Sequence, residues 1–251
     1  MAQGVTTVVL PDNDARAADL ALGFLYPGYA AEDDLPYLTA SLVPTATAEV
    51  VHTSVGEDAH RVDALLDLGS SVRLAHGAAE LAGRGVAAVV WACTSGSFVF
   101  GWDGARRQAD EIGKRLAVPA SSTSLAFADA CGHLGITRVA IAATYPADVT
   151  EYLVEFLAHA GVEVAAAGSS GIITATEVGT VDGAAVQELV HRCDHPDAEA
   201  VLVPDTALHT ARVLPELRRT AAKPVLTANQ VTVWQAARLA GHAAANSLLQ
   251  E

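Results

Sequence analysis

The stretch "VAAVVWACTSGS", residues 86 to 97, leads from a continuous apolar run into a cysteine followed by hydroxyl and glycine residues. A continuous apolar run is typical of a strand that is covered by helices on both faces. Similar runs occur at 21–27, 48–55, 138–146, 162–168, 198–205 and 223–229. Together they predict an α/β protein with mainly parallel strands.

Amphipathic stretches separate these runs, and each is long enough for a crossover helix. They lie at 57–84, 103–117, 147–160, 182–193, 208–221 and 229–241. Aromatic residues make up only 5% of the chain, whereas 51% of it is hydrophobic. We therefore expect a core of small aliphatic side chains at close contacts between helices and sheet.

Three pairs of segments resemble one another and follow in the same order, at separations of 105 to 119 residues. The pairs are "FLYPG" (24–28) with "ATYPA" (143–147), "VVWACTSGS" (89–97) with "VLVPDTALHT" (201–210), and "VPASSTS" (118–124) with "KPVLTAN" (223–229). Their common order indicates a duplicated unit. We expect two similar lobes related by a pseudo-twofold axis, each with a mainly parallel sheet flanked by helices.

Ligands of open parallel sheets bind at the carboxyl ends of the strands. Four chemistry-bearing residues fall there, namely Tyr26, Cys93, Tyr145 and Asp205. If the lobes face each other, Cys93 and Asp205 stand on opposite sides of one cleft. The sequence thus predicts an active site between the lobes with one acid or base from each side.

Two interpretations of Cys93 stay open. The backbone N–H groups and hydroxyls of Thr94, Ser95 and Ser97 are expected to lower the thiol pKa and to hold a carboxylate or an enediolate, with Gly96 permitting a close backbone approach. Alternatively, Cys93 is a buried structural thiol and the hydroxyls cap a helix.

The segments "ACTSGSF" (92–98), "AATYPADV" (142–149) and "KPVLTANQVTVWQAARLAG" (223–241) resemble the aspartate/glutamate racemase superfamily. They are most similar to its branch of maleate cis–trans isomerases and arylmalonate decarboxylases, over about residues 20 to 241. The resemblance implies chemistry without a cofactor on a small carboxylic acid, in a homodimer or larger homo-oligomer. It also implies that the last helical segment returns to the first lobe, so that the lobes comprise 1–125 with 227–251, and 126–226.

The resemblance also assigns individual residues. Cys93 matches the first of the two cysteines that commonly flank the substrate in this superfamily, and Asp205 stands where the second is expected. Decarboxylases keep the second cysteine and lack the first, so this chain has the mirror arrangement. The substrate-binding set that we expect comprises Thr94, Ser95 and Tyr145, which match carboxylate-binding residues, together with Tyr26, Pro27 and Thr206. The loop "YPGYAAEDD" (26–34) departs from the Asn-containing loop that is typical of maleate isomerases.

Asp205 also has two interpretations. A partly desolvated carboxyl between the lobes would have a raised pKa and could return a proton to a carbanion formed opposite Cys93. Alternatively, Asp205 caps the helix that is expected from residue 208.

These observations support three hypotheses of function. The first is an isomerase or racemase of a small carboxylic acid, with Cys93 as nucleophile or base and Asp205 as the opposing acid. The second is decarboxylation of a disubstituted malonate through an enediolate that Cys93 protonates. The third is a two-lobed binding protein that has lost catalysis.

Several other partners are not expected. The formal net charge is -14, with no basic stripe, which argues against nucleic acid. No apolar run approaches the roughly 18 residues of a membrane span, and the first 20 residues lack the features of a signal peptide, so we expect a cytoplasmic protein without a membrane partner. The three cysteines are expected to be reduced thiols. The spacing of "HRCDHP" (191–196) does not place its side chains on one helix face, so we expect no metal site.

Overall fold

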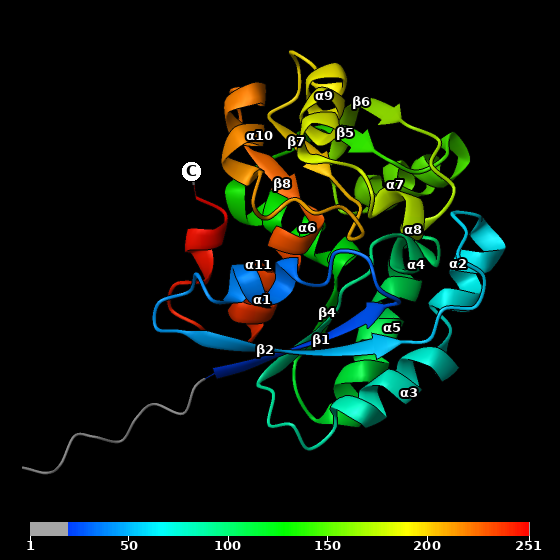
Figure 1. Ribbon diagram of the computed structural model, residues 1–251, viewed down its shortest axis with the longest axis vertical. Helices are drawn as coiled ribbons and strands as arrows, with labels where there is room; N and C mark the ends of the chain where they lie inside the picture. The colour runs from blue at the N-terminus through cyan, green and yellow to red at the C-terminus, as the bar shows by residue number, and fades with distance from the viewer. Residues whose placement is uncertain (1–19, 251) are drawn as a thin grey trace, which may run out of the picture.

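The protein contains two parallel four-stranded sheets, which lie in the lower and upper parts of Figure 1. The computed structural model describes residues 20–250, so the N-terminal segment 1–19 lies outside the described residues. The first sheet contains β1 (Leu20–Pro27), β2 (Ala46–Thr53), β3 (Ala88–Trp91) and β4 (Ala120–Ser122). The second contains β5 (Arg138–Ala143), β6 (Glu163–Ser169), β7 (Ala200–Val203) and β8 (Val225–Thr227).

The strand order is the same in both sheets, β2-β1-β3-β4 and β6-β5-β7-β8. The repeated segments lie on or directly after equivalent strands, namely β1 and β5, β3 and β7, and β4 and β8. The predicted α/β class with two similar lobes is confirmed.

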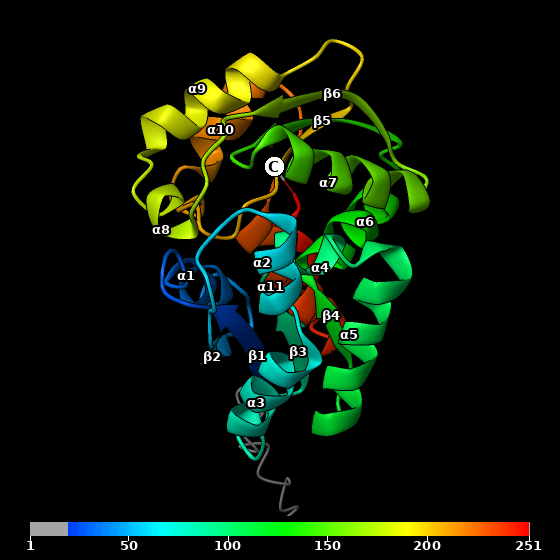
Figure 2. The same cartoon turned by 90° about the vertical axis from the view of Figure 1, so that its right-hand side faces the viewer.

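The helices lie between the strands in the chain and flank both sheets (Figures 1 and 2). Those up to β5 are α1 (Asp34–Thr39), α2 (Val62–Leu68), α3 (Ser71–Leu81), α4 (Ser95–Phe98), α5 (Gly101–Leu116) and α6 (Thr123–Leu134). The later ones are α7 (Ala147–His159), α8 (Ala175–Val178), α9 (Gly183–Cys193), α10 (Leu214–Ala221), α11 (Ala228–Leu239) and the 3₁₀-helix η1 (Ala245–Leu248). Within the described residues, no helix is both long and apolar enough to cross a membrane.

Two expected helices differ from the structure. The stretch 57–84 forms two helices, because the backbone leaves the helical conformation at Ser70, whose ψ is 148°. Position 69 between them requires glycine, since a Cβ there would lie 2.2 Å from the carbonyl oxygen of Gly96. The helix expected over 208–221 begins only at Leu214, after a series of turns.

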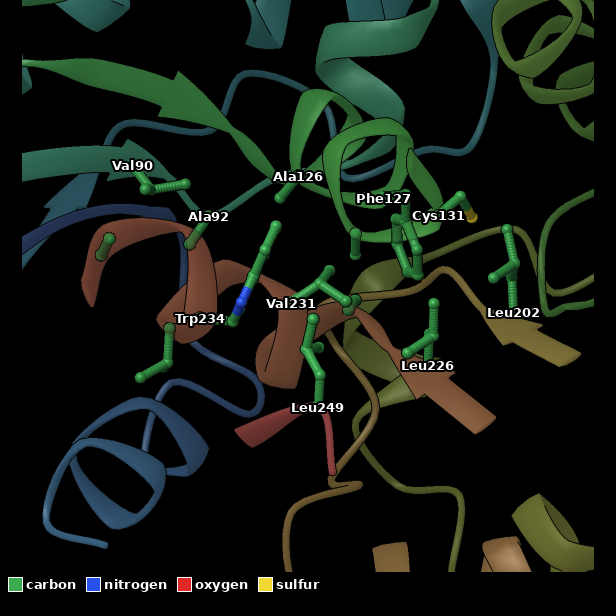
Figure 3. Packing of buried hydrophobic residues seen from close by; sticks show 14 of the residues in the cluster. Val90, Ala92, Ala126, Phe127, Cys131, Leu202, Leu226, Val231, Trp234 and Leu249 are labelled. Carbon is green, nitrogen blue, oxygen red and sulfur yellow. The ribbon is translucent and has the colours of Figure 1, made fainter. Parts of the chain in front are cut away.

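One apolar cluster runs through both lobes (Figure 3). It includes Val90 of β3 and Leu202 of β7, and between them Phe127 of α6 and Trp234 of α11. Helix α11 contacts β3, α1 and α6. The two sheets are thus joined by a continuous core, and the limits of the two lobes, 1–125 with 227–251 and 126–226, stay a prediction.

Candidate active site

Cys93 and Asp205 each follow the end of an equivalent strand by two residues, Cys93 after β3 and Asp205 after β7. Both side chains are buried, and both line one cavity of about 270 Å³. Of the other expected site residues, four also line it, namely Tyr26, Pro27, Ser95 and Thr206. The structure therefore brings six of the eight predicted residues together around one cavity.

The thiol of Cys93 accepts hydrogen bonds from the Gly96 N–H group and from Ser95. Position 96 has no room for a larger residue, because a Cβ there would lie 2.7 Å from the Trp91 ring and 3.2 Å from Cys93 Sγ. Burial, together with a smaller contribution from the Asp205 carboxylate, nevertheless raises the pKa of Cys93 to about 12. The two donors lower this pKa, as expected, but desolvation outweighs them, so the net shift is upward.

Tyr145 and Thr94 are buried behind the cavity, at 1% exposure each. The Tyr145 hydroxyl lies against the side chains of Thr94 and Ser95 from the first lobe, and it donates to Pro204 O at 2.8 Å. Burial raises the pKa of Tyr145 well above its ordinary value. The phenol therefore keeps its proton and remains a donor at this boundary between the lobes.

Tyr26 is the equivalent tyrosine at the end of β1. Its hydroxyl donates to Thr206 O at 2.9 Å and accepts a bond from the Ala31 N–H group at 3.0 Å. Because both bonds are made within the protein, Tyr26 joins β1 to the loop that follows β7, and it presents mainly its ring to the cavity.

The carboxylate of Asp205 is held by two hydrogen bonds. Ala207 N–H donates to Oδ1 at 2.9 Å, and the Thr144 hydroxyl donates to Oδ2. The bond to Ala207 belongs to a local turn of the Asx type. The interpretation of Asp205 as a helix cap is wrong, because the next helix begins only at Leu214.

The loop before α2 supplies site residues that sequence reasoning missed. It crosses to the second lobe beside α8 (Figure 2), where Asp58 accepts hydrogen bonds from Ala175 N at 2.8 Å and Thr176 N at 3.1 Å. His60 Nδ1 lies 2.9 Å from Ile172 O. Asp58 and His60 both line the cavity. In the sequence, "GEDAH" (56–60) has the composition of a solvated loop, and only the tertiary structure places it over the cleft.

The segment "HRCDHP" has other roles. Cys193 is buried, and Asp194 pairs with Lys223 at 2.8 Å. Within the part of the chain that the structure describes, no group of three or more His, Cys, Asp and Glu side chains could hold a metal ion.

Comparisons with known proteins agree with this architecture. In sequence, arylmalonate decarboxylase from Bordetella bronchiseptica is 33% identical over 126 residues, which are 49% of this chain and 52% of that protein, so the match spans about half the relative's length. A solved double variant of arylmalonate decarboxylase in its liganded form, with one glycine changed to cysteine and one cysteine to serine, is 28% identical. It has a TM-score of 0.79 over 89% of this chain and 94% of its own.

A Cys-to-Ser variant of the maleate cis–trans isomerase from Nocardia farcinica, solved with a covalently bound succinylcysteine intermediate, shares the fold. Its TM-score is 0.83 at 19% identity, over 92% of this chain and 99% of that one. The family model for arylmalonate decarboxylase matches residues 69–248. With the duplicated sheets and the cavity between them, this match over most of the chain shows that the protein belongs to the arylmalonate decarboxylase family of enzymes.

Proposed function

We propose that this protein decarboxylates a substituted malonate and that Cys93 protonates the product carbon. The observation that carries the proposal is the buried thiol in the cavity wall, whose pKa is raised to about 12. At neutral pH such a thiol holds its proton, which suits an acid and does not suit a nucleophile or a base. The decarboxylase alternative is therefore preferred over the isomerase or racemase that the sequence placed first.

The proposed reaction begins with one substrate carboxylate bound by the Ser95 hydroxyl in the cavity wall. The hydroxyls of Thr94 and Tyr145, directly behind this wall, turn to the same carboxylate, and Tyr145 exchanges its bond to Pro204 for one to the substrate. The bond from the central carbon to the other carboxylate breaks, carbon dioxide leaves, and the electron pair passes into the retained carboxylate as an enediolate. The S–H group of Cys93 then transfers its proton to the central carbon. Water returns a proton to the thiolate.

The wall next to the loop 55–60 offers space for a substituent of the malonate. It is formed by apolar side chains that line the cavity, namely Val55, Ala59, Ala64, Leu65 and Leu68. An apolar pocket of this kind favours burial of an aryl or alkyl group. Its presence supports a substrate larger than malonate itself.

The comparisons support a single catalytic thiol that lies in the first lobe instead of the second. The solved double variant of arylmalonate decarboxylase gained one cysteine and lost another. This chain has Cys93 in its first lobe and Asp205 at the equivalent place in its second lobe. A single proton donor on one side is sufficient for decarboxylation, since the reaction needs only one proton at carbon.

Racemisation is the second candidate, and the position of Asp205 favours it. Asp205 lines the same cavity as Cys93 but comes from the opposite lobe. In this reaction Asp205 would remove the α-proton of a carboxylic acid, and Cys93 would supply a proton to the other face of the carbon.

The test is turnover of aryl- and alkylmalonates in heavy water by the wild type and by Cys93→Ser. We expect the wild type to release carbon dioxide and to form one enantiomer with one deuterium at carbon. Cys93→Ser should be slower by about 10²–10⁴-fold, because a hydroxyl is a much weaker acid than a thiol. Its melting temperature should change little, since the two side chains are close in size.

Cys193→Ser is the matched control, because Cys193 lies outside the cavity-lining residues, and it should keep its activity. If Cys93→Ser decarboxylates as fast as the wild type, Cys93 is not the proton donor. Deuterium exchange into recovered α-chiral acids without decarboxylation of any malonate would favour racemisation instead.

A further inference from the structure

His60 is a polar residue of the cavity that the proposed reaction does not use. It is 8% exposed, lies on the loop before α2, and packs edge-on against the Tyr145 ring at 5.0 Å between centroids. It belongs to the same wall as Ala59, Ala64 and Leu65. A histidine on a wall that otherwise favours an aryl or alkyl group points to a substituent with a polar atom.

The partner of Nδ1 fixes the tautomer of the neutral ring. Ile172 O, at 2.9 Å, is a carbonyl oxygen and can only accept, so Nδ1 carries the hydrogen. Nε2 is then an acceptor with a free lone pair. Nε2 has no hydrogen-bond partner in the described part of the chain, and it is not among the fully buried atoms left without one. It is therefore the ring nitrogen that can reach a molecule in the cavity.

The surroundings of His60 also accept hydrogen bonds. The carboxylates of Glu57, Asp58 and Asp205 line the cavity, and none of its lining residues in the described chain is a lysine or an arginine. Glu57 is paired with Arg61 at 2.9 Å, but no lysine or arginine of the described chain forms an ion pair with Asp58 or Asp205. An anionic group on the substituent would be repelled by these two carboxylates. A neutral group that donates a hydrogen bond has no such disadvantage.

We propose that His60 Nε2 accepts a hydrogen bond from a hydroxyl or N–H group on the substituent of the substrate, so that His60 selects hydroxyaryl or similar donor-bearing malonates over plain aryl ones. The inference rests on the proposed function for the malonate part of the substrate. It adds the residue that recognises the other end of the molecule. A buried acceptor that stays unpaired with a plain aryl group provides the discrimination.

Two substitutions separate this role from the contact with Ile172. In His60→Asn, the amide nitrogen lies as many bonds from the backbone as Nδ1 and can still donate to Ile172 O. In His60→Gln, the amide reaches the place of Nε2 and can still accept a bond from the ligand. His52→Asn is the control, because His52 Nδ1 is likewise bound to a backbone carbonyl, Gly28 O at 2.6 Å, but His52 does not line the cavity.

The experiment measures calorimetric binding of 4-hydroxyphenylacetate and phenylacetate, which are products and need no catalysis, and kcat/KM for the two corresponding arylmalonates. The wild type and His52→Asn should prefer the hydroxylated member of each pair by roughly tenfold. His60→Asn should abolish the preference without a loss of melting temperature, and His60→Gln should retain part of it.

Equal binding of both arylacetates, no binding of either, preference for a carboxyphenyl analogue, or an unchanged preference in His60→Asn would overturn the inference. Selective binding of the hydroxylated ligand without turnover of any malonate would leave His60 recognition standing and refute the decarboxylase proposal. Equal turnover of both malonates would refute recognition by His60 and leave the decarboxylase proposal standing.

Discussion

At the scale of single residues, burial decides what Cys93 can do. The thiol has two donors, Gly96 N–H and Ser95, yet its pKa is raised to about 12 because the side chain is only 3% exposed. Neutral groups are favoured where water is excluded, and the Asp205 carboxylate acts in the same direction. A thiol in this setting stays protonated throughout the neutral pH range and can act as an acid.

The first prediction concerns alkylation of Cys93. At pH 8 iodoacetamide should modify it on the order of 10³-fold more slowly than a free thiol of pKa about 8.5, since only the thiolate reacts. The rate should increase about tenfold per pH unit up to about pH 11, which separates a high pKa from poor access. Peptide mass spectrometry over a pH series measures both. A plateau above pH 9 would contradict the raised pKa.

The second prediction concerns Asp205→Asn. Asn can keep the contacts to Thr144 and Ala207, so the melting temperature should change little. If Asp205 is the opposing acid or base, exchange of deuterium into an α-chiral acid should slow by about 10²–10⁴-fold. Decarboxylation with Cys93 as donor should change by less than about tenfold. Comparable losses in both reactions would place Asp205 in the decarboxylation step.

At the scale of elements, α1 and α11 fix the loop that carries Asp205. Asp34, the first residue of α1, accepts hydrogen bonds at Oδ2 from Thr210 N at 2.8 Å and Ala211 N at 3.0 Å. Asn229 of α11 donates to the same oxygen at 3.2 Å and to Thr206 O at 3.2 Å. A loop without regular structure thus has its backbone groups satisfied by one buried carboxylate and one amide.

The third prediction compares Asp34→Ala with Asp33→Ala. Loss of the buried Asp34 acceptor leaves two backbone donors, Thr210 N and Ala211 N, unpaired and should lower the free energy of unfolding by about 2–4 kcal/mol. Asp33 is exposed and pairs with the half-exposed His209 at 3.1 Å, so its loss should change the stability by less than about 0.5 kcal/mol. Urea unfolding of both variants measures the difference. Equal stabilities would show that the α1 contacts do not hold the loop.

At the scale of the whole molecule, two kinds of contact join the lobes. The apolar core continues from one sheet to the other through α6 and α11. On the open side of the cavity, the contact is polar, from Asp58 to the backbone of Ala175 and Thr176. Burial raises the pKa of Asp58, but the hydrogen bonds from Thr176 and Ala175 outweigh this and lower the pKa overall.

The fourth prediction concerns this polar contact. Asp58→Ala should increase amide hydrogen exchange at 172–178 and raise KM several-fold, while the exposed Asp63→Ala should not. Since the folded pKa of Asp58 is depressed, its stabilisation is complete above the unfolded value of about 3.9 and is lost as the pH falls through the folded pKa. Exchange at 172–178 should therefore rise below about pH 4 in the wild type and stay pH-independent in Asp58→Ala, after correction for intrinsic rates. Unchanged protection in Asp58→Ala at pH 7 would contradict the role of this contact.

Sequence periodicity and repetition were sufficient to predict much of the fold. Continuous apolar runs identified the central strands, because a strand covered on both faces has no polar side in its pattern. The ordered repeats identified the equivalent strand ends, and hence Cys93 and Asp205 as partners across one cavity. Helix limits were less predictable, as at 208–221, where the early turns are stabilised by Asp34 and Asn229, which are remote in the sequence.

The amino-acid sequence by itself determined the two-lobed α/β class and the residues at the ends of β3 and β7, because strand patterning and strand-end chemistry are local properties of the chain. Only the tertiary structure decided the protonation state of Cys93, since desolvation depends on every element that surrounds the thiol. It also brought Asp58 and His60 across to the second lobe, more than 110 residues away in the sequence. No local pattern encodes such contacts, because the packing of the two lobes creates them.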